Sequence, residues 1–161
     1  MFRIATALLC TLALAATQSG AAEQASKHEL KGAPEMTTEI TNKDAWTIYE
    51  KYLEGWNSRS DDMRKKVAAE ITTDNIQYRT RNHDLGGRTE IIADMASFQE
   101  KFPGGHFDVG DVSTHHDVAL LTWVLVQADG KVFAQGHDQI RVNADGKISS
   151  IITFPPPTKT P

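Results

Sequence analysis

The segment from Lys131 to Val142 carries an aspartate where a buried strand normally has an apolar side chain. Residue types alternate along it, so Asp138 shares a face with the apolar Ile140. That face is the one expected to point inward, and an unpaired buried carboxylate is costly. We therefore expect Asp138 to have a dedicated partner or to line a cavity. Ala134 and Gly136, the two preceding residues on this face, are small enough to leave room for a ligand.

A carboxylate in an apolar cavity suits proton transfer, because desolvation raises its pKa toward neutrality. Tyr78, on the inward face of a short strand predicted over residues 75–80, could donate a hydrogen bond to a developing enolate. Together these residues suit proton abstraction next to a carbonyl, as in isomerisation or aldol cyclisation. The structural alternative is that Asp138 only accepts hydrogen bonds, from Tyr78, Trp123 or a helix N-terminus, and stabilises the fold.

The histidines give a second candidate group. His83, beside Asp84 in a loop expected over the cavity mouth, could act as a general acid or base near neutral pH. A His–Asp pair that positions water would suit a hydratase or dehydratase. His115 and His116 are adjacent, so at most one of them faces inward. The sequence has neither His-x-His nor His-x-x-x-His spacing, and no metal or cofactor is predicted.

The first 22 residues have the features of a secretory signal peptide. A basic Arg3 is followed by an apolar run from Ile4 to Ala16 and then by small residues that suit cleavage after Ala21 or Ala22. A retained anchor is the alternative. Export to the periplasm or secretion is therefore expected, with no further membrane attachment after cleavage.

Composition excludes several kinds of partner and chemistry. The only cysteine, Cys10, lies in the apolar run, so the mature chain has no thiol for disulfides, nucleophilic catalysis or metal binding. The net charge of −4 becomes about −5 once Arg3 is removed. This acidic balance argues against nucleic acid and anionic membranes as partners.

Four segments follow from these patterns. We expect a signal peptide over residues 1–22, a flexible leader over 23–40, one folded domain over 41–154 and a Pro-rich tail over 155–161.

Helices are predicted in the first half of the domain. An aromatic stripe made of Trp46, Tyr49, Tyr52, Leu53 and Trp56 has helical spacing, and we expect it to face the core. A second helix begins at Ser60 and is expected to present Met63, Val67 and Ile71 inward. A third follows Gly86-Gly87 and ends at Pro103-Gly104-Gly105.

Strands are predicted in the second half, over residues 107–112, 118–127, 131–142 and 147–154. The turns at 128–130 and 143–146 make the last three an antiparallel meander. The strand over 118–126 is apolar on both faces, so helices should cover one face and a second subunit the other. The expected architecture is α+β: a cone-shaped, curved antiparallel sheet with three helices on its concave face.

This order of elements resembles the nuclear transport factor 2-like fold and, within it, the SnoaL-like group of polyketide cyclases and ketosteroid isomerase relatives. The resemblance covers about residues 42–154. It rests on Tyr78, the helix start Gly87–Ile92, Phe102-Pro103-Gly104, Leu121-Thr122-Trp123, Gly136-His137-Asp138 and Asp145–Ile148. In it, Asp138 takes the Gly-x-Asp position of the third meander strand.

The chain departs from the family pattern at two places. Ketosteroid isomerases carry a catalytic aspartate at the end of the first strand, where this chain has Arg79-Thr80. Several cyclase relatives end the last strand in Trp-x-x-Asp, whereas here it reads Ile151-Ile152-Thr153-Phe154. Neither acid can be carried over, and the fold itself hosts both enzymes and non-catalytic modules.

The resulting hypothesis is an exported lyase- or isomerase-type enzyme, dimeric through its convex sheet face, acting on a small apolar carbonyl compound. Asp138, Tyr78 and His83 are its candidate catalytic residues. The expected ligand contacts are Trp123, Trp56, Thr80, His116 and Phe98. The alternative is a non-catalytic ligand-binding or association module.

Overall fold

The structure is a computed structural model that describes residues 39–156. The predicted signal peptide, all but the last two residues of the predicted leader and residues 157–161 of the predicted tail lie outside the described part. Ile40, assigned by its sequence to the leader, belongs to the domain: it is buried, and its N–H donates to the His116 carbonyl oxygen over 2.9 Å. No helix within residues 39–156 is long and apolar enough to cross a membrane.

Helix α1 (Asn42–Asn57) supplies the aromatic face on which the domain is built. Thr41 caps its N-terminus, accepting a hydrogen bond from the Asp44 N–H and donating one to its carboxylate. Its buried face, at three- and four-residue spacing, consists of Ala45, Tyr49, Tyr52, Leu53, Gly55 and Trp56. The inward position predicted for Trp46 is wrong. This side chain is 36% exposed and lies at the edge of the buried face, about 100° away from Ala45 around the helix.

Helix α2 (Asp61–Ile71) is capped by Ser60 and buries Arg64, Val67 and Ala68. The inward position predicted for Met63 is also wrong, since Met63 is 40% exposed. A spacing of four residues drifts by about 40° per step, so residues 63, 67 and 71 cannot all lie on one narrow stripe.

Helix α3 (Arg88–Lys101) begins after Gly87, whose φ of +94° favours glycine. It buries Ile91, Met95, Phe98 and Gln99.

Within residues 39–156, six strands form one curved sheet in the order β2-β1-β6-β5-β4-β3. They are β1 (Thr72–Arg79), β2 (Asp84–Gly86), β3 (His106–His115), β4 (Val118–Val126), β5 (Val132–Val142) and β6 (Ile148–Phe154). The predicted meander is confirmed, because β4, β5 and β6 pair antiparallel in sequence order. The sheet is nevertheless mixed: β1 pairs with β6 in parallel and carries the short β2, which the sequence did not predict.

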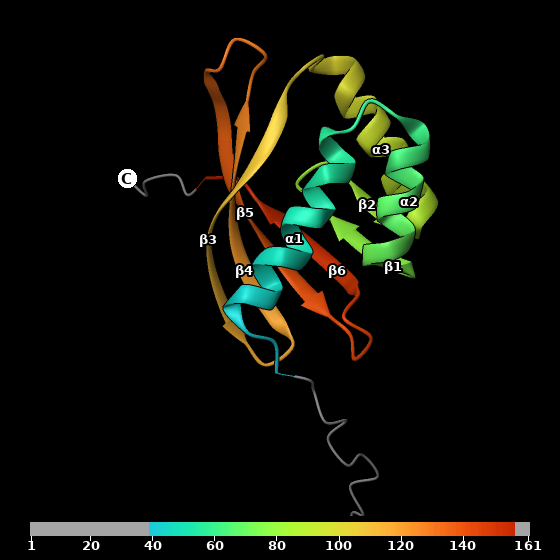
Figure 1. The fold of residues 1–161 in the computed structure, drawn as a ribbon, viewed down its shortest axis with the longest axis vertical. Helices are drawn as coiled ribbons and strands as arrows, with labels where there is room; N and C mark the ends of the chain where they lie inside the picture. Colours follow the sequence, from blue (N-terminus) through green and yellow to red (C-terminus); the bar gives the residue numbers. More distant parts are fainter. Residues whose placement is uncertain (1–38, 157–161) are drawn as a thin grey trace, which may run out of the picture. The chain divides into compact units, whose positions relative to one another are not determined.

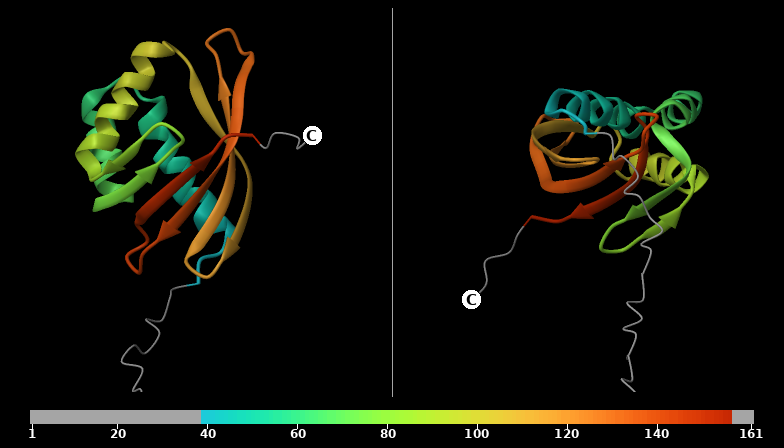
Figure 2. Two further views of the ribbon diagram at one scale, coloured as in Figure 1. Left: turned by 180° about the vertical axis from the view of Figure 1, so that it is seen from behind. Right: turned by 90° about the horizontal axis from the view of Figure 1, so that it is seen from below.

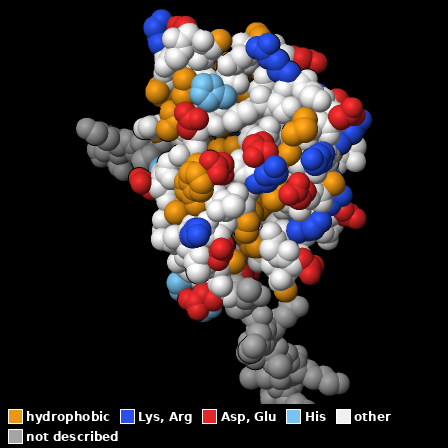
Figure 3. Space-filling view, in the orientation of Figure 1, with side chains coloured by type: hydrophobic (Ala, Val, Ile, Leu, Met, Phe, Trp, Pro, Cys, Tyr) orange, Lys and Arg blue, Asp and Glu red, His pale blue; other side chains and the backbone are white. Residues whose placement is uncertain are grey.

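All three helices lie on one side of this sheet, as predicted, and the sheet curls toward them (Figures 1 and 2). The α+β cone is therefore confirmed. The core lies between the two layers and includes Tyr49, Ile91 and Leu121. On the face seen in Figure 3, basic side chains over the helices are interspersed with acidic ones.

The alternation that placed Asp138 inward is confirmed. Gly136, Asp138, Ile140 and Val142 are buried in β5, while the residues between them are exposed or half-buried. On β4 the inward set is Ala119, Leu121, Trp123 and Leu125, and on its other face Leu120 is 46% exposed.

Candidate functional site

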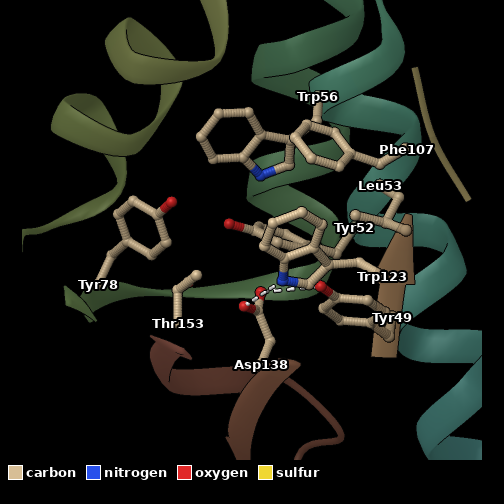
Figure 4. Close-up of a pocket in the computed structure, with 9 residues that line it drawn as sticks. All are labelled: Tyr49, Tyr52, Leu53, Trp56, Tyr78, Phe107, Trp123, Asp138 and Thr153. Carbon is tan, nitrogen blue, oxygen red and sulfur yellow. Dashed lines mark hydrogen bonds between the residues drawn. The ribbon is translucent and has the colours of Figure 1, made fainter. Parts of the chain in front are cut away.

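A cavity of about 200 Å³ lies between α1 and the concave face of the sheet. Helix α1 forms one wall, and each strand except β2 contributes one side chain to the rest (Figure 4). The lining residues are Tyr49, Tyr52, Leu53, Trp56, Tyr78, Phe107, Trp123, Asp138 and Thr153. The cavity is smaller than the roughly 300–1,000 Å³ of sites for drug-sized ligands, which points to a smaller molecule.

Among the described residues, Asp138 is the only charged side chain that lines this cavity, and two hydrogen bonds hold it in place. The Tyr49 hydroxyl, from α1, donates to Oδ2 over 2.8 Å, and the Trp123 indole N–H, from β4, donates to Oδ1 over 3.0 Å. Asp138 is only 5% exposed. A carboxylate offers about four acceptor sites, so these two bonds leave capacity for a ligand.

Burial raises the pKa of the Asp138 carboxyl from 3.8 to about 6. The nearby donor groups of Tyr49, Thr153 and Trp123 lower the pKa, because they stabilise the charged form. Desolvation therefore outweighs the donors, and the group can both accept and return a proton near neutral pH.

Gly136 determines where the Trp123 indole lies. The two residues are paired across β4 and β5, and a Cβ on Gly136 would come within 2.4 Å of the indole ring. The prediction that Gly136 leaves room for a ligand is therefore wrong, because the indole occupies that space. What the small residue provides is access of the indole N–H to Asp138, two residues further along β5.

The opposite side of the cavity presents hydroxyl groups. Tyr52 and Tyr78 point toward one another across the space, and the indole nitrogen of Trp56 faces the gap between them (Figure 4). The Tyr52 hydroxyl is buried and has no hydrogen-bond partner among the described residues. Burial, reinforced by nearby carboxylates, raises the pKa of both phenols, which therefore remain protonated donors at neutral pH.

Four of the predicted site residues come together around this cavity: Asp138, Tyr78, Trp123 and Trp56. Four others are not among the lining residues. Phe98 is buried behind Trp56 and Phe107, at ring-centroid distances of 5.8 and 4.7 Å.

Thr80 instead closes the β1–β2 turn, where its hydroxyl accepts from the N–H groups of Asn82 and His83. His83 is exposed and pairs with Asp94 of α3 at 3.4 Å, while its sequence neighbour Asp84 pairs with Arg79. His116 lies in the exposed turn after β3, with its Nδ1 2.9 Å from that of His115.

Five lining residues were not predicted as site residues: Tyr49, Tyr52, Leu53, Phe107 and Thr153. The α1 residues were visible in the sequence as an aromatic stripe, but such a stripe equally fits an ordinary core. Two tyrosines three residues apart on a buried helix face were the available signal, since each brings a hydroxyl that needs a partner. Thr153 could have been found from strand register, because it pairs with Asp138 across β5 and β6.

No group of three or more His, Cys, Asp or Glu side chains suited to a metal ion gathers within the described part of the chain.

Comparison with known proteins agrees with this architecture. The model of the SnoaL-like domain family matches residues 49–151. None of the curated proteins compared with the chain is significantly similar to it.

Among solved structures, a candidate isomerase of the SnoaL-like family from Agrobacterium tumefaciens is similar at 26% identity and a TM-score of 0.67, covering 71% of this chain and 99% of its own. A candidate SnoaL-like polyketide cyclase from Jannaschia is 22% identical, with a TM-score of 0.57 over 71% of this chain and 86% of its own. A candidate ketosteroid isomerase from Kribbella flavida is 18% identical, with a TM-score of 0.55 over 74% and 83%. The last two comparisons bear on the fold alone.

Replacing Gly136 by alanine should destabilise the domain by about 1–3 kcal/mol, because the new methyl group overlaps the Trp123 ring and the Phe154 carbonyl oxygen. Urea unfolding monitored by fluorescence measures this. Gly86→Ala on β2 is the matched control: its Cβ meets nothing closer than the Gln77 side chain at 3.5 Å, so a change within about 0.5 kcal/mol is expected. Equal effects of the two substitutions would contradict the packing described for Gly136.

Asp138 should also make stability depend on pH. The folded protein keeps this proton up to about pH 6, whereas the unfolded chain loses it near 3.8. Protonation of Asp138 therefore adds about 3 kcal/mol to the free energy of unfolding below pH 4, and this contribution is lost as the pH rises through 6. We expect the difference in unfolding free energy between the wild type and Asp138→Asn to fall by about this amount between pH 4 and pH 7.5. Parallel curves for the two proteins would show that the carboxyl is not desolvated.

Proposed function

Because this chain belongs to the SnoaL-like domain family, we propose that it is an isomerase-, cyclase- or lyase-type enzyme acting on a small, mostly apolar carbonyl compound. The observation that carries the proposal is the buried Asp138 carboxyl, whose pKa of about 6 suits proton transfer at neutral pH. A group with this pKa is mostly ionised at pH 7 and still basic enough to remove a proton acidified by a neighbouring carbonyl.

The cavity supplies the second requirement of such chemistry. As Asp138 takes the proton from carbon, negative charge develops on the carbonyl oxygen, and hydrogen-bond donors must meet it. The hydroxyls of Tyr52 and Tyr78, on the side of the cavity away from Asp138, are placed to donate. The buried Tyr52 hydroxyl favours this role, because it has no partner among the described residues and a ligand oxygen would satisfy it.

Tyr49 and Trp123 act as positioning residues in this scheme. Their bonds come from two different elements and fix the carboxylate of Asp138 without covering it. The alternative function, non-catalytic binding of a small ligand, is supported by the same apolar cavity. The two functions differ in their need for Asp138, because simple ligand binding does not require its charge.

Proton abstraction can be followed without the natural substrate. In D₂O a carbonyl compound such as cyclohexanone exchanges its α-hydrogens for deuterium, and NMR reports the rate. The wild type should accelerate this exchange, and Asp138→Asn should lower the rate by roughly two to four orders of magnitude, the usual scale for loss of a general base. The rate should rise with pH through about 6, as Asp138 ionises.

Asp129→Asn, in the exposed turn between β4 and β5, is the matched control and should behave as the wild type. Several small ketones could bind and yet exchange their α-hydrogens no faster than in a control reaction without protein. In that case the non-catalytic alternative replaces this proposal.

We also propose that two copies associate through the convex sheet face. Leu120 and Phe154 are 46% and 47% exposed there, and Val124 and Ile152 lie beside them at half burial. A monomer rarely leaves such a surface open, and a twofold axis would bury it in both copies.

Light scattering at micromolar concentration should give twice the mass of the chain, and Leu120→Lys should shift it toward one chain. A monomeric wild type would contradict this assembly.

The sequence features of residues 1–22 support a further proposal, that the protein acts after export, in the periplasm or outside the cell.

A further inference from the structure

A second carboxylate lies at the core-facing side of α3. Asp94 follows the buried Ile91 by three residues and precedes the buried Phe98 by four, so it shares their side of the helix. Its side chain is only 17% exposed. Among the described residues its one ion-pair partner is His83, whose Nδ1 lies 3.4 Å from Oδ2.

Asp94 lies one turn of α3 before Phe98, whose ring packs against the cavity-lining Trp56 at a centroid distance of 5.8 Å, so its carboxylate lies close behind the cavity wall. Burial is the main cause that raises the pKa of Tyr52 and Tyr78, and the charges of Asp138 and Asp94 both raise it further. The two hydroxyls point into the space that the lining residues enclose (Figure 4). Two carboxylates, one on the sheet and one on α3, therefore impose a negative potential on the same small volume.

Little opposes this potential. The nine lining side chains include no lysine, arginine or histidine. Two histidines that can carry positive charge lie outside the lining: His83 is 45% exposed beside Asp94, and His137 lies on the other face of β5 from Asp138. Charges interact more strongly in a partly desolvated site than in water, so an anion entering here meets repulsion that no positive charge among the nine lining residues offsets.

We propose that this cavity selects its ligand by charge, admitting neutral molecules and cations and excluding anions, and that Asp94 is a specificity-determining residue for this selection. The identity of the substrate rests in addition on the proposed function. Charge selection and that function together give a ketone, aldehyde or ester without a free carboxylate or phosphate. Oxo acids and phosphorylated carbonyl compounds are then excluded as substrates. The charge selection itself requires no turnover.

Benzoate, benzamide and benzamidine test this directly, because they are planar molecules of the same size that differ in charge: an anion, a neutral molecule and a cation. Titration followed by ¹H–¹⁵N NMR at pH 7.5 gives the affinity of each probe and shows where it binds. The indole signals of Trp56 and Trp123, which line the cavity, should move, while that of Trp46 outside it stays. Benzoate should bind at least about tenfold more weakly than benzamide.

Asp94→Asn should narrow the gap between benzoate and benzamide by about three- to tenfold, because one of the two repelling charges is gone. The matched control is Asp84→Asn, which removes an exposed charge from β2, paired with Arg79, and should leave the gap unchanged. The comparison of the three probes on the wild type needs no variant and stands if Asp94→Asn fails to fold.

Benzoate binding as tightly as benzamide, or equal effects of the two variants, would overturn the charge selection. So would failure of both benzamide and benzamidine to bind at 10 mM, since the cavity would then not admit neutral or cationic molecules of this size. These outcomes are separate from the fate of the catalytic proposal, which the deuterium-exchange rate of Asp138→Asn decides.

Discussion

The structure depends on one buried carboxylate and the two donors that hold it. Asp138 of β5 links its strand to two other elements: it accepts one hydrogen bond from Trp123 of the neighbouring strand β4 and one from Tyr49 of α1, which is distant in sequence. At this position desolvation raises the pKa of the carboxyl and hydrogen bonding lowers it. The raised pKa shows that desolvation is the larger effect, so the donors fix the carboxylate without suppressing its basicity. An acid held in this way is both a structural link and a group suited to chemistry.

The geometry around Asp138 follows from close packing of small and large residues. Gly136 provides the volume that the Trp123 indole fills, and the indole places its N–H two residues along the strand, at Asp138. On the other side, the aromatic face of α1 sets one wall of the cavity. Because its tyrosines bring hydroxyls as well as rings, the wall that excludes water also carries donors.

Much of the fold could be predicted because hydrophobic periodicity is a local property. The alternation in β5, the tight turns of the meander and the three helices were all visible in the sequence and are confirmed. Errors arose where angle around a helix mattered: Trp46 and Met63 belong to apolar patterns but lie at the edge of the buried stripe. The parallel pairing of β1 with β6 joins segments about 75 residues apart, and no local signal specifies it.

Sequence by itself determined which residue types face the interior, and so that an acid would be buried at position 138. It also indicated Tyr78, Trp56 and Trp123 as residues of the same cavity. Only the tertiary structure decided what the acid meets there. Tyr49 reaches it because α1 crosses the concave face, and Trp123 reaches it because Gly136 makes room. His83 pairs with Asp94 rather than with the adjacent Asp84, because the turn between β1 and β2 brings it against α3. Contacts of this kind depend on distances between elements, which packing sets and residue spacing along the chain does not.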